Sequence, residues 1–451
     1  MPNLNIESYY NILDTFEPAQ VHGRVSKVIG LVIEAEGPVT PLGSICDIIS
    51  QEDGRKIRAE VLGFRDNHVL LMPLEEINGI SPGCRVVASK EKASLPVGKG
   101  FLGRVVDGLG RPIDGKGPIV PEAEYPLYTS PVNPLARRRI SEPLDLGVKA
   151  INGLLTVGQG QRMGIFSGSG VGKSILLGMI ARHTKADCNV IALIGERGRE
   201  VNEFIEKELG AQGLKKSVVV VATSDHLPLI RMRGAFTATA IAEFFRDRCL
   251  NVNLMMDSVT RFATAQREIG LALGEPPASK GYTPSVFTML PKLLERAGSI
   301  EGCGTITGLY TVLVEGDDFN EPVADAVRAI LDGHLVLTRE LAMQNHYPAI
   351  DVLASVSRVM NDIADDTHLD LANQLKKVLA TYRKHEDLIK IGAYSAGSSP
   401  DIDYAIEKNH AINTYLMQEI DERASLFQSI EGLAAIFAPA ATDRQPMAAT
   451  V

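Results

Sequence analysis

A glycine-rich segment in the middle of the chain has the residue types that bind the phosphates of a nucleotide. Its residues are Ser167, Gly168, Ser169, Gly170, Val171, Gly172, Lys173 and Ser174. The glycines allow the backbone to curl so that successive N–H groups point at phosphate oxygens, and a helix that follows adds the positive end of its dipole. We expect Lys173 to reach the β- and γ-phosphates and the Ser174 hydroxyl to ligate Mg²⁺. The usual pattern begins with glycine rather than Ser167, but the Gly-Lys-Ser end is intact, so the segment predicts binding of a nucleoside triphosphate.

Two acidic residues at the ends of apolar runs are candidates for the remaining chemistry. Asp257 follows Leu254-Met255-Met256, and an acid at the tip of a buried strand beside the loop would hold a Mg²⁺-bound water. Glu196 follows another apolar run, where a carboxylate within hydrogen-bond reach of the attacking water would act as general base. Taken alone, Asp257 is also compatible with an ordinary turn cap, and Glu196 with a solvated cluster of charged neighbours.

Alternating strands and helices must position these side chains. The runs 190–194, 218–222 and 252–256 are apolar apart from Asn253, as in strands of a buried parallel sheet, and each precedes a helix-like stretch. This alternation begins at Leu95 and predicts an α/β domain over residues 94–369.

The segments on either side of this domain have different patterns. Residues 19–93 contain short apolar runs separated by turn residues and predict a small β-barrel. Residues 370–451 have helical periodicity and predict a helical domain, with one helix that runs to Gly392 and a second from about Asp401 to Ile420.

The two ends of the chain carry weaker signals. Residues 1–18 contain an amphipathic helix from Leu4 to Phe16, which either packs on the chain's own barrel or docks another protein. We expect the final residues, from Ala438 to Val451, to be loose.

Composition limits the classes of function that fit. The chain has 451 residues, 45% of them hydrophobic, and a net charge of −9, which disfavours a large basic face for nucleic acid. The five cysteines are scattered and never form a C-x-x-C pair, so we expect small buried hydrophobes in a reducing compartment. The chain has no signal for secretion and no run that approaches 18 apolar residues. We therefore expect a cytoplasmic protein that contacts the membrane only through partners.

Further motifs resemble the catalytic subunits of the rotary ATPase superfamily. The matching segments are Gly195-Glu196-Arg197-Gly198-Arg199-Glu200, residues 257–263, residues 103–110 and residues 143–148. Within that superfamily, residues 281–287 and 290–298 resemble the type III export ATPases. The similarity runs from about residue 20 to residue 430. It implies a RecA-like P-loop ATPase core between an N-terminal β-barrel and a C-terminal helical domain.

The resemblance also assigns roles to individual residues. It places Lys173 and Ser174 at the phosphates and Mg²⁺, Glu196 as the catalytic carboxylate and Asp257 as the strand-end acid. Arg197 and Arg261 would support the site beside them.

Two more residues match the family in the second half of the chain. Tyr347, in the segment 346–351, matches the tyrosine that stacks on adenine, although a tyrosine before a proline can also be a packed turn aromatic. Arg358, in Ser355-Val356-Ser357-Arg358, matches the arginine finger, whose guanidinium binds the transferring phosphoryl group. The alternative role for Arg358 is a surface ion pair.

In this family the finger comes from the neighbouring subunit, so the resemblance implies a homo-oligomeric ring, expected to be a hexamer. It also implies a stator-like regulatory protein at the N-terminal helix, a central stalk protein, export chaperones with their substrates, and a membrane export gate. We expect a location at the inner face of the cell membrane and no nucleic-acid partner.

The implied function is ATP hydrolysis at the base of a bacterial type III export apparatus, with the flagellar apparatus as first choice. The alternatives are a virulence secretion ATPase, the catalytic subunit of a rotary ATP synthase, and a ring-shaped nucleic-acid translocase. One chain carries both Glu196 and Arg358, which favours a homo-ring over the ATP synthase. The acidic composition and the lack of an aromatic and basic surface in residues 20–90 disfavour the translocase.

Overall fold

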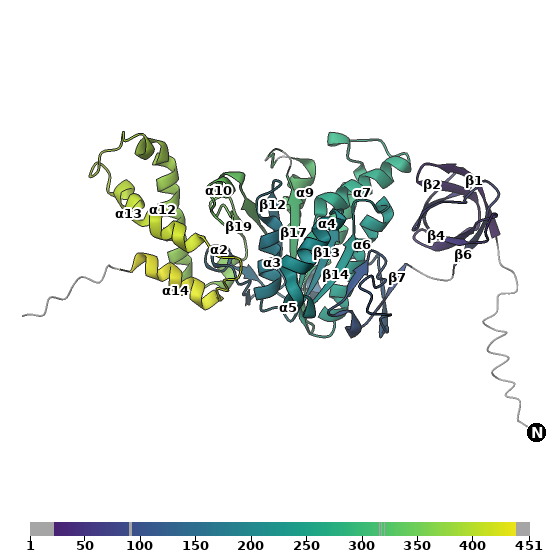
Figure 1. The fold of residues 1–451 in the computed structure, drawn as a ribbon, viewed down its shortest axis with the longest axis horizontal. Coiled ribbons are helices and arrows are strands. Elements are labelled where there is room, and N and C mark those ends of the chain that lie inside the picture. The colour runs from purple at the N-terminus through teal and green to yellow at the C-terminus, as the bar shows by residue number, and fades with distance from the viewer. Residues whose placement is uncertain (1–21, 90–92, 315, 317, 320, 439–451) are drawn as a thin grey trace, which may run out of the picture.

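The computed structural model describes residues 22–89, 93–314, 316, 318–319 and 321–438. A barrel, a central α/β region and a group of C-terminal helices follow one another along the longest axis of the molecule (Figure 1). The predicted helix from Leu4 to Phe16, and all but the first residue of the predicted loose C-terminal tail, lie outside the described residues.

The predicted barrel is confirmed as a closed, six-stranded barrel in the order β1-β2-β5-β4-β3-β6. Its strands are β1 His22–Ile29, β2 Val32–Glu36, β3 Ile45–Ile49, β4 Lys56–Arg65, β5 His68–Pro73 and β6 Arg85–Ala88. Asp66 and Asn67 have φ of 45° and 62° and form the two-residue turn between β4 and β5, as residues that tolerate positive φ do in tight hairpins. Inward side chains such as Ile33 and Leu71 fill the barrel.

A nine-stranded sheet forms the central region, with β19-β18-β12-β17-β15-β13-β14-β8 as its main order and β16 paired to β17. The strands of this path are parallel except for the edge strand β19, which runs antiparallel to β18. The sheet strands are β8 Val105–Asp107, β12 Arg162–Ser167, β13 Cys188–Ile194, β14 Ser217–Ala222, β15 Asn251–Asp257, β16 Gly298–Ser299, β17 Thr305–Leu313, β18 Gly333–Leu337 and β19 Val356–Ser357. Two small ladders pair β7 Ser94–Val97 with β9 Ala123–Pro126, and β10 Pro143–Leu144 with β11 Val157–Gly158. The three apolar runs thus form β13, β14 and β15.

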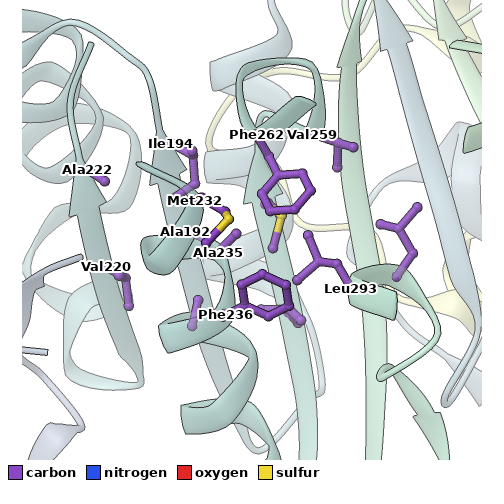
Figure 2. Close-up of a cluster of buried hydrophobic side chains, with 14 of the residues drawn as sticks. Ala192, Ile194, Val220, Ala222, Met232, Ala235, Phe236, Val259, Phe262 and Leu293 are labelled. Carbon is purple, nitrogen blue, oxygen red and sulfur yellow. The ribbon is translucent and has the colours of Figure 1, made fainter. Parts of the chain in front are cut away.

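The central region also contains ten α-helices among its described residues. They are α2 Lys149–Leu154, α3 Lys173–His183, α4 Gly198–Glu203, α5 Gly210–Lys215, α6 Pro228–Arg246, α7 Val259–Ala272, α8 Pro284–Leu294, α9 Pro322–Ile330, α10 Arg339–Met343 and α11 Met360–Ile363. Shorter or irregular turns are η1 Lys99–Phe101, η2 Pro134–Ala136, η3 Phe204–Leu209 and η4 Ser279–Gly281. Helix α6 is buried along its whole length. Its side chain Phe236 lies 5.8 Å from Phe262 of α7, ring centroid to centroid, in an edge-to-face arrangement (Figure 2).

Two large hydrophobic clusters lie on either side of the sheet, because neighbouring residues of a strand point to opposite faces. Phe166 of β12 belongs to the cluster that contains α6, and Ile165 belongs to the cluster that contains α3. The first cluster also includes barrel residues Val32, Leu70 and Met72. The second includes side chains of the C-terminal helices. Both flanking regions therefore share apolar contacts with the central sheet.

A buried ion pair crosses from the barrel to the central region. Glu60 of β4 lies 2.6 Å from Arg233 of α6, and their side chains are 2% and 7% exposed. Burial raises the pKa of the Glu60 carboxyl, and Arg233 opposes that change.

The C-terminal region consists of α12 Asp366–Lys390, α13 Pro400–Leu416 and α14 Leu426–Phe437. The side chain of Asp365 caps α12 and a capping box at Ser425 starts α14. The predicted domain boundary at residue 370 falls inside α12. The helix predicted to reach Ile420 ends at Leu416, because the backbone N–H of Gln418 bonds to the Tyr347 carbonyl instead of continuing the helix.

The cysteine prediction is only partly right. Cys46, Cys84 and Cys188 are buried, whereas Cys249 is exposed and Cys303 is intermediate. Burial raises the pKa of the Cys46 thiol to about 11. Within the described ranges, no helix combines the length and apolarity needed to cross a bilayer.

Candidate nucleotide-binding and catalytic site

The phosphate-binding segment forms the turn between strand β12, which ends at Ser167, and helix α3, which begins at Lys173. Gly170 and Gly172 have φ of 78° and 85°, in the left-handed region that favours glycine. A Cβ on Gly172 would lie 3.3 Å from the ring of Tyr347, so the space is tight as well. Among the residues that the structure describes, no side chain caps the start of α3, which leaves the helix N-terminus available for an anion.

Lys173 already has anionic neighbours. Its Nζ lies 2.6 Å from Oδ1 of Asp257 and 3.7 Å from Oε1 of Glu196. Burial alone would lower the pKa of Lys173, but the two carboxylates outweigh that effect and raise it. The ammonium is therefore held charged beside the loop.

Asp257 ends strand β15, two strands from the loop strand β12, at the same carboxyl edge of the sheet. Between them, Thr311 of β17 donates a 2.7 Å hydrogen bond from Oγ1 to Oδ1 of Asp257. Thr311 was not found from the sequence, because it is one of three threonines in β17 and no motif distinguishes it from the others. Together, Lys173 and Thr311 orient the Asp257 carboxylate.

The oxygen atoms present fit a magnesium ion. Ser174 is an exposed residue of the first turn of α3, and its hydroxyl has no hydrogen-bond partner in the described part of the chain. Oδ2 of Asp257 likewise accepts no hydrogen bond within that part. Mg²⁺ prefers such oxygen donors and keeps several of its waters, with phosphate oxygens as further ligands.

Glu196 follows β13, the strand next to β15. Its Oε1 is buried without a hydrogen-bond partner among the described residues. Burial, followed by the negative charge of Asp257, raises the pKa of the Glu196 carboxyl to about 7, against the opposing effect of Lys173. A buried carboxylate that has one oxygen without a hydrogen bond and a pKa near neutrality is suited to accept a proton from water.

The structure does not bring the guanidinium groups of Arg197 and Arg261 to this cluster. The Arg197 side chain is 82% exposed and lies 3.6 Å from Glu200. Arg261 is an exposed residue in the first turn of α7, and its aliphatic stem covers Gly195, where a Cβ would lie 2.7 Å from the Cβ of Arg261. Both arginines thus lie next to the backbone around Glu196 without an ion pair to its carboxylate.

Tyr347 lies beside the phosphate loop. Its ring contacts the position of Gly172 closely, and the residue is 38% exposed. Its carbonyl accepts a 2.9 Å hydrogen bond from the backbone N–H of Gln418, in the segment after α13. The ring is therefore in place for a ligand held by the loop.

Arg358 lies near the amino end of strand β12, whereas the phosphate loop follows the carboxyl end of that strand. Its backbone N–H donates to the carbonyl of Asp332, and Asp332 in turn pairs with Arg162, the first residue of β12. The loop follows the last residue of β12, and at roughly 3.3 Å per residue this strand spans about 17 Å. That distance is longer than an arginine side chain, so Arg358 does not reach the Lys173 of its own chain. Arg358 is exposed, and its guanidinium has no ion pair with any described residue.

Three family models match the chain. The nucleotide-binding domain of the ATP synthase alpha/beta family matches residues 147–357, and the beta-barrel domain of the same family matches residues 25–90. The T3SS EscN ATPase C-terminal domain matches residues 364–435.

Characterised proteins match over nearly the whole chain. The chain is 54% identical over 436 residues to a "Flagellum-specific ATP synthase" of Bacillus subtilis (strain 168), which covers 96% of this chain and 99% of that protein. It is 50% identical over 425 residues to a "Type 3 secretion system ATPase" of Xanthomonas euvesicatoria, with 94% and 97% covered.

Solved structures agree with these matches. The assembled ATPase EscN from the enteropathogenic E. coli type III secretion system is 47% identical, with a TM-score of 0.87, and covers 92% of this chain and 100% of that chain. EscN in complex with its central stalk EscO gives a TM-score of 0.85 at the same identity and coverage.

Proposed function

Because the chain belongs to the ATP synthase alpha/beta family, in the branch of the flagellar and type III export ATPases, we propose that it hydrolyses ATP to drive flagellar protein export. The observation that carries this proposal is the convergence of Lys173, Asp257 and Glu196 at one edge of the sheet. Lys173 supplies the charge for phosphate binding, and Oε1 of Glu196, 3.7 Å from the Lys173 ammonium, has no hydrogen-bond partner among the described residues.

The residues divide the reaction as follows. The loop N–H groups and Lys173 bind the triphosphate, and Lys173 exchanges its contact with Asp257 for phosphate oxygens. Ser174 and, through water, Asp257 would hold Mg²⁺, which neutralises charge on the phosphates. Oε1 of Glu196 accepts a hydrogen bond from the attacking water and takes its proton as the water oxygen bonds to the γ-phosphorus. The bond from the γ-phosphorus to the bridging oxygen breaks, which gives ADP and phosphate.

Arg358 acts on the site of an adjoining copy in this proposal. Its distance from its own loop, and its lack of an ion pair with any described residue, support that role, because an exposed guanidinium can bind a neighbour's γ-phosphate through several donors. A contact between different faces of identical chains closes into a ring, and we propose a hexamer. Arg197 and Arg261 would support Glu196, and Tyr347 would stack on the adenine.

The partners follow from the same family. The similar ATPase EscN has been solved in complex with its central stalk EscO. In this proposal the C-terminal helices would contact such a stalk, and also export chaperones with their substrates. Residues 1–18 would dock a stator-like regulator, and the ring would lie in the cytoplasm under the membrane export gate. A virulence secretion role is the second candidate, because the Xanthomonas euvesicatoria protein is nearly as similar. Loss of motility after deletion of the gene, with secretion of virulence proteins intact, would support the flagellar role.

The split site is tested by ATP turnover per chain over a dilution series. We expect turnover to fall steeply where the protein dissociates into monomers, while monomers still bind nucleotide, because each chain retains its own loop and Lys173. Sedimentation at the same concentrations identifies the monomer range. Undiminished turnover by monomers would contradict a site built from two copies.

A further inference from the structure

One buried glutamine joins the C-terminal helices to the nucleotide site. Gln418 lies in the segment between α13 and α14 and is only 6% exposed. Its Oε1 accepts a hydrogen bond of 2.8 Å from the backbone N–H of Lys149. Its Nε2 donates to the carbonyls of Gly147 and Glu422, at 2.9 Å and 2.7 Å. The amide is thus hydrogen-bonded at both ends, and two of its partners lie just before and at the start of α2.

The backbone of the same residue holds the candidate adenine-stacking residue. The Gln418 N–H donates a 2.9 Å hydrogen bond to the carbonyl of Tyr347. The Tyr347 ring is in turn packed against Gly172 of the phosphate loop. A chain of contacts therefore runs from the side chain of Gln418, through its own backbone, to the aromatic ring beside the phosphate loop.

The rest of the segment is anchored independently of Gln418. Nζ of Lys149 lies 2.7 Å from Glu422. Nδ2 of Asn152 donates to the carbonyl of Ala424, and the Ala424 N–H donates to Gly147. Loss of the Gln418 amide would therefore release the end of the segment nearest Tyr347 and leave the C-terminal helices attached.

We propose that Gln418 is a positioning residue that fixes Tyr347 against the phosphate loop and so sets the affinity for the adenine base. This inference rests on the proposed role of Tyr347 as the base-stacking residue. Loss of the amide leaves the Lys149 N–H and the Gly147 carbonyl without this partner inside the protein, so the segment and the Tyr347 carbonyl shift together. The phosphate contacts of Lys173 are unaffected.

The test replaces Gln418 with methionine, which has a similar length but no amide. Gln418→Met should raise KM for ATP about three- to tenfold, the effect of one or two lost hydrogen bonds on binding, and change kcat by less than about twofold. Gln374→Met is the matched control, because Gln374 is exposed on α12 and makes one 3.3 Å bond to Tyr404. The control should leave both constants unchanged. If the methionine variant does not fold, Gln418→Asn carries the same expectation, since it keeps the amide on a side chain too short to reach both partners.

A double-mutant cycle with Tyr347→Ala separates positioning from a merely structural role. Once the ring is absent, Gln418→Met should produce no further rise in KM. An unchanged KM in the folded Gln418→Met variant, or a rise of equal size with and without the Tyr347 ring, would overturn the proposal for Gln418. An unchanged KM in Tyr347→Ala alone would instead overturn the stacking role of Tyr347, on which the proposal rests.

Discussion

The charged groups near the two ends of strand β12 differ in burial and pairing. At its carboxyl end, the side chains of Lys173 and Asp257 are 12% and 6% exposed and lie 2.6 Å apart. At its amino end, Arg358 is exposed and has no ion pair with a described residue. Buried charges need a partner within the chain, whereas a guanidinium that serves another molecule can remain solvated until they meet. The difference fits the proposal that each chain holds one half of the site complete and presents its Arg358 to the site of another copy.

Removal of the exposed Arg358 side chain should have the largest effect on turnover. Arg358→Ala should lower turnover roughly 10³-fold or more while the Kd for nucleotide stays within about threefold, as expected for a group that acts on the transition state. Lys173→Ala should weaken both binding and turnover, because Lys173 contacts the ground-state phosphates. Arg24→Ala, an exposed arginine of the barrel, is the control and should be neutral. A loss of tenfold or less for Arg358→Ala would contradict its assignment.

Mixing the two inactive variants tests whether Lys173 and Arg358 act from different copies of the chain. A ring of Arg358→Ala and Lys173→Ala chains contains interfaces with an intact lysine on one side and an intact arginine on the other. Equal mixing should restore on the order of a quarter of wild-type turnover, because each interface draws its two halves from different copies. No recovery in mixed rings would mean that both residues act within one chain.

The pH dependence of kcat/KM should show the ionisation of the buried Glu196 carboxyl. Glu196 must be ionised to take a proton, and burial raises its pKa to about 7, so kcat/KM should fall as pH decreases below about 7. Glu200 contributes to this upward shift, so Glu200→Gln should move the midpoint to lower pH. A flat profile across the neutral range in the wild-type protein would exclude Glu196 as the base.

Replacing Tyr347 should have a smaller effect, confined to binding. Tyr347→Ala should raise KM for ATP about tenfold, within the range measured for aromatic stacking on a base, with kcat nearly unchanged. Tyr347→Phe retains the ring and should behave like the wild-type protein. An effect on kcat as large as that on KM would indicate a catalytic role instead.

Much of the fold could be predicted from local patterns. The apolar runs of β13, β14 and β15 are buried on both faces, which leaves a signal in the sequence that needs no knowledge of neighbours. Gly170 and Gly172 of the phosphate loop are favoured by their own positive φ angles. The helix end at Leu416 could not be predicted, because it depends on bonds from Gln418 to Tyr347 and Lys149, which are distant in the sequence.

Site residues could be predicted where the residue type and its motif indicate the chemistry. They could not be predicted where the role depends on how distant segments pack together. Lys173, Glu196 and Asp257 belong to motifs, and the structure brings these three together. Thr311 and Gln418 are ordinary residues that matter through contacts between distant segments. Likewise, only the sheet register reveals that Arg358 lies at the opposite end of β12 from Lys173.

The apolar contact between the barrel and the sheet has a consequence for dissecting the protein. Val32, Leu70 and Met72 are 4%, 4% and 1% exposed in the whole chain, because they belong to the cluster on the α6 side of the sheet. In a fragment that ends after the barrel, these three side chains would be exposed and would form a hydrophobic surface patch. Such a fragment would be prone to self-association, so its behaviour in solution would say little about the barrel in the intact molecule.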